Sequence, residues 1–88
     1  MKSEFRKELK ARAHHLKPVV LLGAKGLTQA VIEETDVALN AHELIKVKIN
    51  GAERDDRRQM AIELCEQLAA ELVQTIGNTI VVYRKKPE

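Results

Sequence analysis

Residues 18–28 read PVVLLGAKGLT, and this stretch is the most informative part of the chain about its fold. Val19–Leu22 is a short, continuously apolar run, which is typical of a strand covered on both faces. Pro18 cannot continue a preceding helix. The run Gly23–Gly26 interrupts the apolar stretch, and Thr28 is a good N-cap for a following helix. The stretch therefore predicts a strand, a glycine-bounded turn and a helix in direct succession.

Hydrophobic periodicity predicts the elements on either side. Before this stretch, residues 4–14 predict an amphipathic helix with a basic outer side, capped by Ser3. After it, apolar spacing continues the second helix to Leu39, and residues 44–49 alternate apolar and charged side chains as a strand does. Gly77-Asn78 predicts a hairpin between residues 73–76 and 79–84. A third helix is predicted over residues 53–72, with an apolar stripe of Ala61, Leu64, Cys65, Leu68 and Leu72.

The resulting order, α-β-α-β-α-β-β, predicts a single α/β domain. Each of the two β-α-β crossovers implies parallel neighbouring strands, and the closing hairpin adds an antiparallel pair, so the sheet is expected to be mixed. The length of 88 residues fits one domain. A composition of 44% hydrophobic and 32% charged residues is that of a globular protein.

Composition also narrows the function. Only Phe5 and Tyr83 are aromatic, so the chain offers few side chains on which bases could stack. No apolar run approaches the ~20 residues needed to cross a bilayer, and residues 1–6 lack the apolar stretch of a secretory signal. The single cysteine, Cys65, cannot form an internal disulfide. We therefore expect a reduced, cytoplasmic protein.

The net charge of +2 conceals a segregated pattern along the chain. Residues 1–28 contain seven basic and two acidic side chains. Residues 29–45 contain four acidic side chains and no basic one, and residues 59–76 contain three acidic side chains alone. Segregated charge of this kind creates a directed field that attracts a polyanion.

The sequence shows no catalytic constellation. His14, His15 and His42 are not spaced as zinc ligands, and we interpret them as a helix-terminal pair and a loop residue. Cys65 falls on an apolar stripe, which favours a packed thiol over a nucleophile. Ser3 is the only serine, and no Ser/His/Asp arrangement can be built from it. We expect no enzymatic activity, no cofactor and no small-molecule substrate.

The turn Gly23–Gly26 is the most informative candidate site. Glycines let the backbone approach a ligand closely, and amides at the start of the following helix favour an anion. Lys25 adds a mobile charge suited to phosphate, although the spacing is too short for a P-loop and equally fits a turn alone. Lys46 and Lys48 form either a solvated strand face or an extension of a basic patch that includes Arg84.

Three segments of the chain resemble the CRM domain (chloroplast RNA splicing and ribosome maturation) and its stand-alone bacterial form, the YhbY family. They are residues 16–28, 38–48 and 77–84, which follow in the right order over nearly the whole chain. The resemblance implies a four-stranded mixed sheet with three helices, similar to the C-terminal domain of bacterial translation initiation factor three. It also implies RNA binding, association with precursors of the large ribosomal subunit, and an RNA clamp at Gly23–Gly26.

We therefore expect residues 1–88 to be one CRM-type RNA-binding domain, a monomer without membrane contact that assists large-subunit assembly. Scarce aromatic residues favour phosphate or shape recognition over base readout. One alternative is a module that docks on a ribosomal protein or factor through its acidic helices. Another is an enzyme that uses the same loop, which needs a deep pocket that so short a chain can hardly supply. The expected RNA-binding residues are Gly23, Ala24, Lys25, Gly26, Lys17, Lys7, Lys10, Arg12, Lys46, Lys48 and Arg84.

Overall fold

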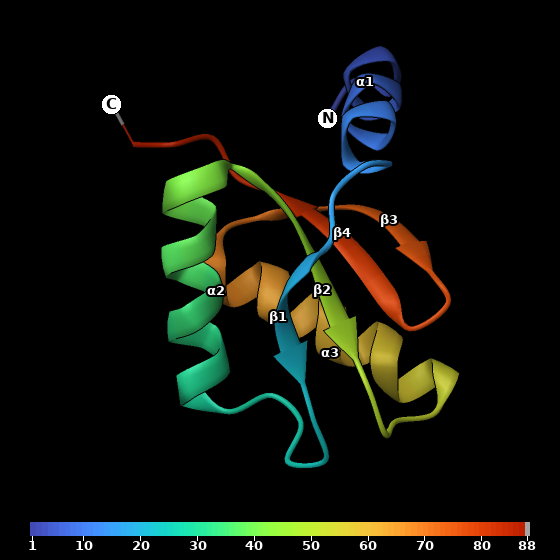
Figure 1. Cartoon of the computed structure of the whole chain (residues 1–88), viewed down its shortest axis with the longest axis vertical. Coiled ribbons are helices and arrows are strands. Elements are labelled where there is room, and N and C mark those ends of the chain that lie inside the picture. Colours follow the sequence, from blue (N-terminus) through green and yellow to red (C-terminus); the bar gives the residue numbers. More distant parts are fainter. Residues whose placement is uncertain (88) are drawn as a thin grey trace.

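Residues 1–87, which the computed structural model describes, form three helices and four strands (Figure 1). The helices are α1 (Ser3–Ala13), α2 (Gln29–His42) and α3 (Arg54–Leu68), and the strands are β1 (Pro18–Leu22), β2 (Leu44–Ile49), β3 (Glu71–Ile76) and β4 (Thr79–Tyr83). This confirms the predicted order and the α/β fold class. Within the described residues, no helix is both long and apolar enough to cross a membrane.

The four strands form one mixed sheet in the order β1-β2-β4-β3. β1 and β2 are parallel, as predicted from the first crossover. The prediction that the second crossover makes β2 and β3 neighbours is wrong, because β4 lies between them and is antiparallel to both. The three consecutive residues Ile80–Val82 of β4 are buried, and a strand that is apolar on both faces is best covered at the centre of a sheet.

The helices cover the two faces of the sheet unequally. α2 and α3 pack on one face, where the main core includes Leu39 of α2, Val47 of β2 and Leu64 of α3. α1 lies on the other face, over one end of the sheet (Figure 1). The smaller core under α1 comprises Leu9, Ala13, Leu44, Val73 and Val81. Among the described residues, no other helix covers the rest of that face.

Polar and ring contacts fix α1 in this position. Nη1 of Arg6 donates hydrogen bonds to the carbonyl oxygens of Leu72 and Val73, both at 2.8 Å. The ring of Phe5 meets that of Tyr83 edge-on, with 5.3 Å between centroids, a favourable arrangement for two aromatic rings. α1 is therefore an integral part of the domain, and its basic side chains have a defined place relative to the sheet.

β1 is covered on one face only, contrary to the prediction. Val20 and Leu22 are buried in the main core, whereas Val19 and Leu21 are 49% and 55% exposed. β1 is an edge strand, and α1 packs over β2 and β3 instead. The apolar run therefore marks a strand with one face open to solvent.

Two helix boundaries also differ from the predictions. α1 begins at Ser3, with Lys2 as the N-cap, so the predicted Ser3 cap is wrong. α3 ends at Leu68, because Ala69 adopts the left-handed conformation with φ 52°. Leu72 consequently belongs to β3 and not to the helical stripe. The other members of that stripe are buried as predicted: Ala61, Leu64, Cys65 and Leu68.

Candidate nucleic-acid interface

The Gly23–Gly26 loop projects from the end of the molecule opposite α1 (Figure 1). It joins β1 to α2, as the sequence predicts. The backbone N–H of Gly26 donates to the carbonyl oxygen of Gly23 at 3.0 Å, which closes a tight turn. Ala24 and Lys25 at the tip of this turn are exposed. The loop therefore presents both its backbone and one cationic side chain to solvent.

The two glycines of the loop differ in what the fold requires of them. Gly26 has φ +71°, a conformation that residues with a Cβ rarely adopt. A Cβ there would also lie 3.9 Å from the side chain of Met60 on α3. Gly23 has no such φ, and a Cβ built on it would meet nothing within 4 Å among the described residues. The fold thus explains the glycine at position 26 and leaves the one at position 23 unexplained.

The start of α2 faces the same region and is suited to an anion. The side chain of Thr28 accepts a hydrogen bond from the backbone N–H of Val31 at 3.2 Å, which confirms the predicted cap. The backbone amides of Gln29 and Ala30 come before Val31 in the first turn of the helix, at the positive end of the helix dipole. No acidic side chain lies in the first turn of α2. Nothing in that turn therefore opposes a bound phosphate.

Two further turns support the loop at this end of the sheet. The backbone N–H of Asn50, which follows β2, donates to the carbonyl oxygen of Leu22 at 2.9 Å. The side-chain amide of Asn78, in the β3–β4 hairpin, donates to Oδ1 of Asn50 at 3.2 Å. A Cβ on Gly51 would lie 3.9 Å from Cα of Ala24. The loop is therefore built on the ends of three strands.

The sheet face beside the loop carries one row of side chains that crosses all four strands. Strand pairing aligns Leu21 of β1 with Lys48 of β2, Lys48 with Thr79 of β4, and Thr79 with Ile76 of β3. We call these four residues the open row. Leu21 and Ile76 are half exposed, and Lys48 and Thr79 are half-buried. Lys48 therefore stands at the middle of an accessible surface.

Most of the remaining basic residues predicted to bind RNA lie on α1 or shortly after it. Lys7 is exposed on α1, and Lys10 lies in a cleft between α1 and the sheet together with Lys46. Arg12 and Lys17 line a separate groove beside the start of β1. The structure thus brings Lys10 and Lys46 together, and places Lys46 two residues from Lys48 on the same strand face.

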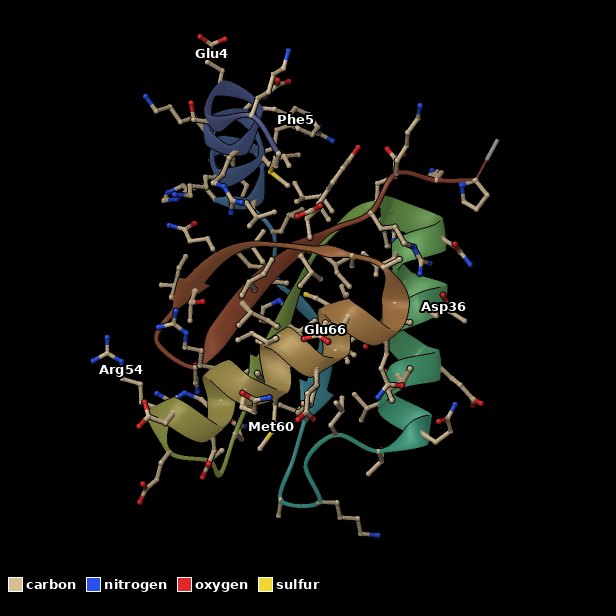
Figure 2. The ribbon with its side chains drawn as sticks, turned by 180° about the vertical axis from the view of Figure 1, so that it is seen from behind. Glu4, Phe5, Asp36, Arg54, Met60 and Glu66 are labelled. Atoms are coloured by element: carbon tan, nitrogen blue, oxygen red, sulfur yellow. The ribbon has the colours of Figure 1, made fainter. Side chains whose placement is uncertain are left out.

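Many of the acidic residues lie on α2 and α3, on the opposite side of the sheet. Glu33 and Glu34 are exposed on α2, and Glu63 and Glu66 are exposed on α3. Figure 2 views the molecule onto α3 and shows Glu66 on the outer side of this helix. Residues 29–45 and 59–76, the acidic parts of the sequence, therefore lie mainly on one side of the sheet, although Glu4 and Glu8 are on α1 and Glu34 also lines a groove with Leu21 and Lys48.

Sequence reasoning missed a second basic cluster, at the start of α3. Arg54, Arg57 and Arg58 line a groove of about 730 Å³ together with Asp55, with Leu72 and Thr75 of β3, and with Gly77 of the β3–β4 hairpin. Figure 2 shows Arg54 pointing outward from the first turn of α3. Nη1 of Arg57 donates to the carbonyl oxygen of Ala52 at 2.6 Å. The helical spacing of these arginines, three and one residues apart, was the available signal.

Arg84 is not brought together with the other predicted residues. Its side chain is only 18% exposed, and Nη1 lies 2.9 Å from Oδ1 of Asp36. It also donates to the carbonyl oxygen of Leu68 at 3.0 Å and to Oδ1 of Asn40 at 2.9 Å. Its backbone pairs with Glu43, at the end of β2 remote from the loop. Arg84 thus ties β4 to α2 and α3, and we leave it out of the candidate interface.

Cys65 is packed in the main core, as predicted. Burial raises the pKa of its thiol to about 11, and the negative charge of Glu71 acts in the same direction. The nucleophilic thiolate is therefore scarce at neutral pH. Among residues 1–87, no three His, Cys, Asp or Glu side chains are grouped so that they could hold a metal ion.

These features define a class of protein, a small α/β domain with a glycine-bounded loop after an edge strand and a basic, partly open sheet face. The sequence profile of the CRS1/YhbY (CRM) domain matches residues 1–84. The chain belongs to this family.

Individual relatives are similar over most of their length. A probable RNA-binding protein of Pseudomonas aeruginosa is 53% identical over 85 residues, covering 97% of this chain and 82% of its own length. An RNA-binding protein of Haemophilus influenzae is 49% identical over 80 residues, covering 91% and 81% respectively. The solution structure of a hypothetical protein from Staphylococcus aureus has a TM-score of 0.87 at 34% identity, covering 100% of this chain and 92% of that one. The predicted family and fold are thereby confirmed.

Proposed function

We propose that this chain binds RNA, and that its target is the RNA of the large ribosomal subunit during assembly in the cytoplasm. The names of the Pseudomonas and Haemophilus relatives support RNA binding. The resemblance of residues 16–28, 38–48 and 77–84 to bacterial members of the family supports the ribosomal target. The chain acts by holding RNA and performs no chemical step.

The observation that carries the proposal is the backbone conformation of Gly23 together with the open space around it. Its backbone conformation does not demand glycine, and none of the described residues occupies the space where a Cβ would stand. That space opens to solvent beside the exposed Lys25. A glycine that the fold does not need is explained by a ligand that approaches the backbone there. A phosphate group suits this position, because the start of α2 and Lys25 both favour negative charge.

The proposed contact extends from the loop over the basic face of the sheet. Lys48 and Lys46 continue along β2 from the loop toward α1, where Lys10 joins them. Exposed lysines bind phosphates without reading the sequence of the bases. The apolar members of the open row, Leu21 and Ile76, offer surface for sugar or base contacts on either side of Lys48. Binding is therefore electrostatic and directed at the RNA backbone.

Ultraviolet crosslinking in living cells tests both parts of the proposal. The full chain is purified under denaturing conditions, the attached RNA is sequenced, and the crosslinked peptides are identified by mass spectrometry. We expect enrichment of precursor RNA of the large subunit and crosslinks within Gly23–Gly26 and β2. RNA recovered only in proportion to its abundance would contradict the ribosomal target, and crosslinks confined to α2 and α3 would contradict the proposed surface. Ala41→Glu on α2 serves as a control that leaves the surface intact.

A further inference from the structure

A cleft of about 480 Å³ separates the C-terminal half of α1 from the sheet. It lies on the face opposite α2 and α3, and none of its lining residues belongs to the Gly23–Gly26 loop. Its lining includes Lys10, His14 and His15 from α1 and the residues after it, Lys46 from β2, and Gln74 and Ile76 from β3. The sequence predicts the two histidines only as a pair at the end of a helix.

The end of α1 positions the two histidines at this cleft. The helix ends at Ala13, and the backbone N–H of His14 donates to the carbonyl oxygen of Ala11 at 3.3 Å. The backbone N–H of Leu16 donates to the carbonyl oxygen of Ala13 at 2.9 Å, which turns the chain back toward β1. The rings of His14 and His15 lie edge to face, 5.4 Å apart. Both side chains are exposed, and both line the cleft.

The charges that line the cleft are all of one sign. Lys10 faces it from α1 and Lys46 from β2, while β3 contributes the uncharged Gln74 and Ile76. None of the described lining residues is acidic. Two permanent cations and two imidazoles around one concave surface therefore create a positive potential with no neutralising carboxylate in the lining. Protonation of an imidazole in the lining adds a positive charge and so increases the attraction of the cleft for an anion.

The cleft and the loop are joined by a continuous track along β2. Lys46 lines the cleft. Lys48 lies on the same strand face, two residues and therefore about 7 Å closer to the loop along β2. β2 then ends next to Asn50, whose backbone N–H is bonded to Leu22 at the base of the loop. The longest dimension of the molecule is 33 Å, so one extended RNA strand can reach both sites.

We propose that this cleft is a second phosphate-binding site, which holds the RNA strand that the loop grips at its other end, and that His14 and His15 strengthen this grip as they become protonated. The inference rests on the proposed RNA binding. It assigns a function to the histidine pair, and it makes RNA affinity depend on pH.

The test measures the affinity of the full chain for a fluorescein-labelled oligouridine, by anisotropy at constant ionic strength, at about pH 8 and about pH 5. We expect the affinity to rise roughly three- to tenfold at the lower pH, since two exposed charge contacts are gained. The double variant His14→Gln, His15→Gln should lose this rise. His42→Gln is the matched control, and should keep the rise.

His42 suits this purpose because it lies outside the cleft. It is the last residue of α2, not a loop residue as predicted, and it lines the groove of Arg12 and Lys17. A second measurement follows the imidazole C–H resonances by NMR during addition of oligouridine. We expect those of His14 and His15 to shift more than those of His42, which lies beside Arg12 and Lys17 outside the cleft.

The outcomes separate this inference from the function on which it rests. If the chain binds oligouridine but the affinity does not rise at low pH, or rises equally in the double variant, the cleft is not a phosphate site and the loop proposal stands. Resonances of His14 and His15 that stay in place during binding would likewise contradict a phosphate site in the cleft. If the chain binds no RNA at either pH, the proposed function itself fails.

Discussion

Replacing Gly23 and Gly26 separately by alanine distinguishes a loop built for a ligand from a turn alone. Each change adds the same methyl group, and the two positions lie three residues apart in one loop. Gly26 has φ +71°, whereas Gly23 has an ordinary φ and open space around its missing Cβ. The structure therefore predicts opposite consequences for folding.

The magnitudes follow from these conformations. An alanine in the left-handed region costs about 1–2 kcal/mol, and restricting the unfolded chain returns about 0.4–1 kcal/mol, so Gly26→Ala should destabilise the domain by up to about 1.6 kcal/mol. Gly23→Ala meets no strain and should be neutral or stabilising by up to about 1 kcal/mol. RNA affinity should nevertheless fall for Gly23→Ala. Losing one hydrogen bond from a backbone amide to a phosphate costs about 1.5–3 kcal/mol, which is roughly ten- to hundredfold.

Urea unfolding monitored by circular dichroism gives the free energy of unfolding of both variants. Fluorescence anisotropy gives their affinity for labelled RNA. The expected signature is a Gly23→Ala protein that is at least as stable as the unmutated chain and binds RNA more weakly. If this stable variant binds RNA as tightly as the unmutated chain, no ligand approaches the backbone at that position. The interpretation of Gly23 as a point of ligand contact would then be wrong.

Three other outcomes are expected. Lys25→Ala should weaken RNA binding and reduce the log–log salt slope by about 0.7, whereas Ala41→Glu, which lowers the net charge equally, should leave the slope unchanged in the same anisotropy assay. Arg84→Gln should lower the free energy of unfolding by about 1–3 kcal/mol in urea titrations, because it leaves the Asp36 carboxylate without its guanidinium partner, and should alter RNA affinity little wherever the protein is folded. The pKa of the Cys65 thiol rises from its usual 9.0 to about 11 on folding, so the folded chain keeps a proton that the unfolded chain loses between these values. Stability should therefore fall as pH rises through that range, and Cys65→Ala should show less of this fall in urea titrations at both ends of it.

Local patterns were sufficient to predict most of the elements and the position of the loop. The Thr28 cap and the Gly77-Asn78 hairpin each depend on residues that are close in sequence, and both are present. The end of α3 was missed because it depends on a left-handed alanine, Ala69, where neither glycine nor proline marks the boundary. Intrinsic preferences continue the helix to Leu72, and the pairing of β3 with β4 overrides them.

Long-range packing explains the other differences. The position of β4 between β2 and β3 is set by burial of both its faces, but its apolar run Ile80–Val82 looks like the run Val19–Leu22 of the edge strand β1, so the run alone does not distinguish a central strand from an edge strand. Arg84 finds its carboxylate partner in Asp36, 48 residues earlier, so its basic character alone did not reveal its structural role. The cleft at His14 and His15 likewise depends on α1 folding over β2 and β3. The sequence identified which residues were basic, and the fold decides which of them share a surface.

The salt dependence of RNA affinity is the decisive measurement for electrostatic RNA binding by this chain. On single-stranded RNA, each phosphate that is neutralised contributes about −0.7 to the slope of log affinity against log salt concentration. With five to seven of the basic residues Lys7, Lys10, Arg12, Lys17, Lys25, Lys46 and Lys48 in contact, we predict a slope of roughly −3 to −5 for the unmutated chain. An affinity that does not change with salt, or no measurable affinity for RNA at low salt, would contradict electrostatic RNA binding and favour docking on a protein partner.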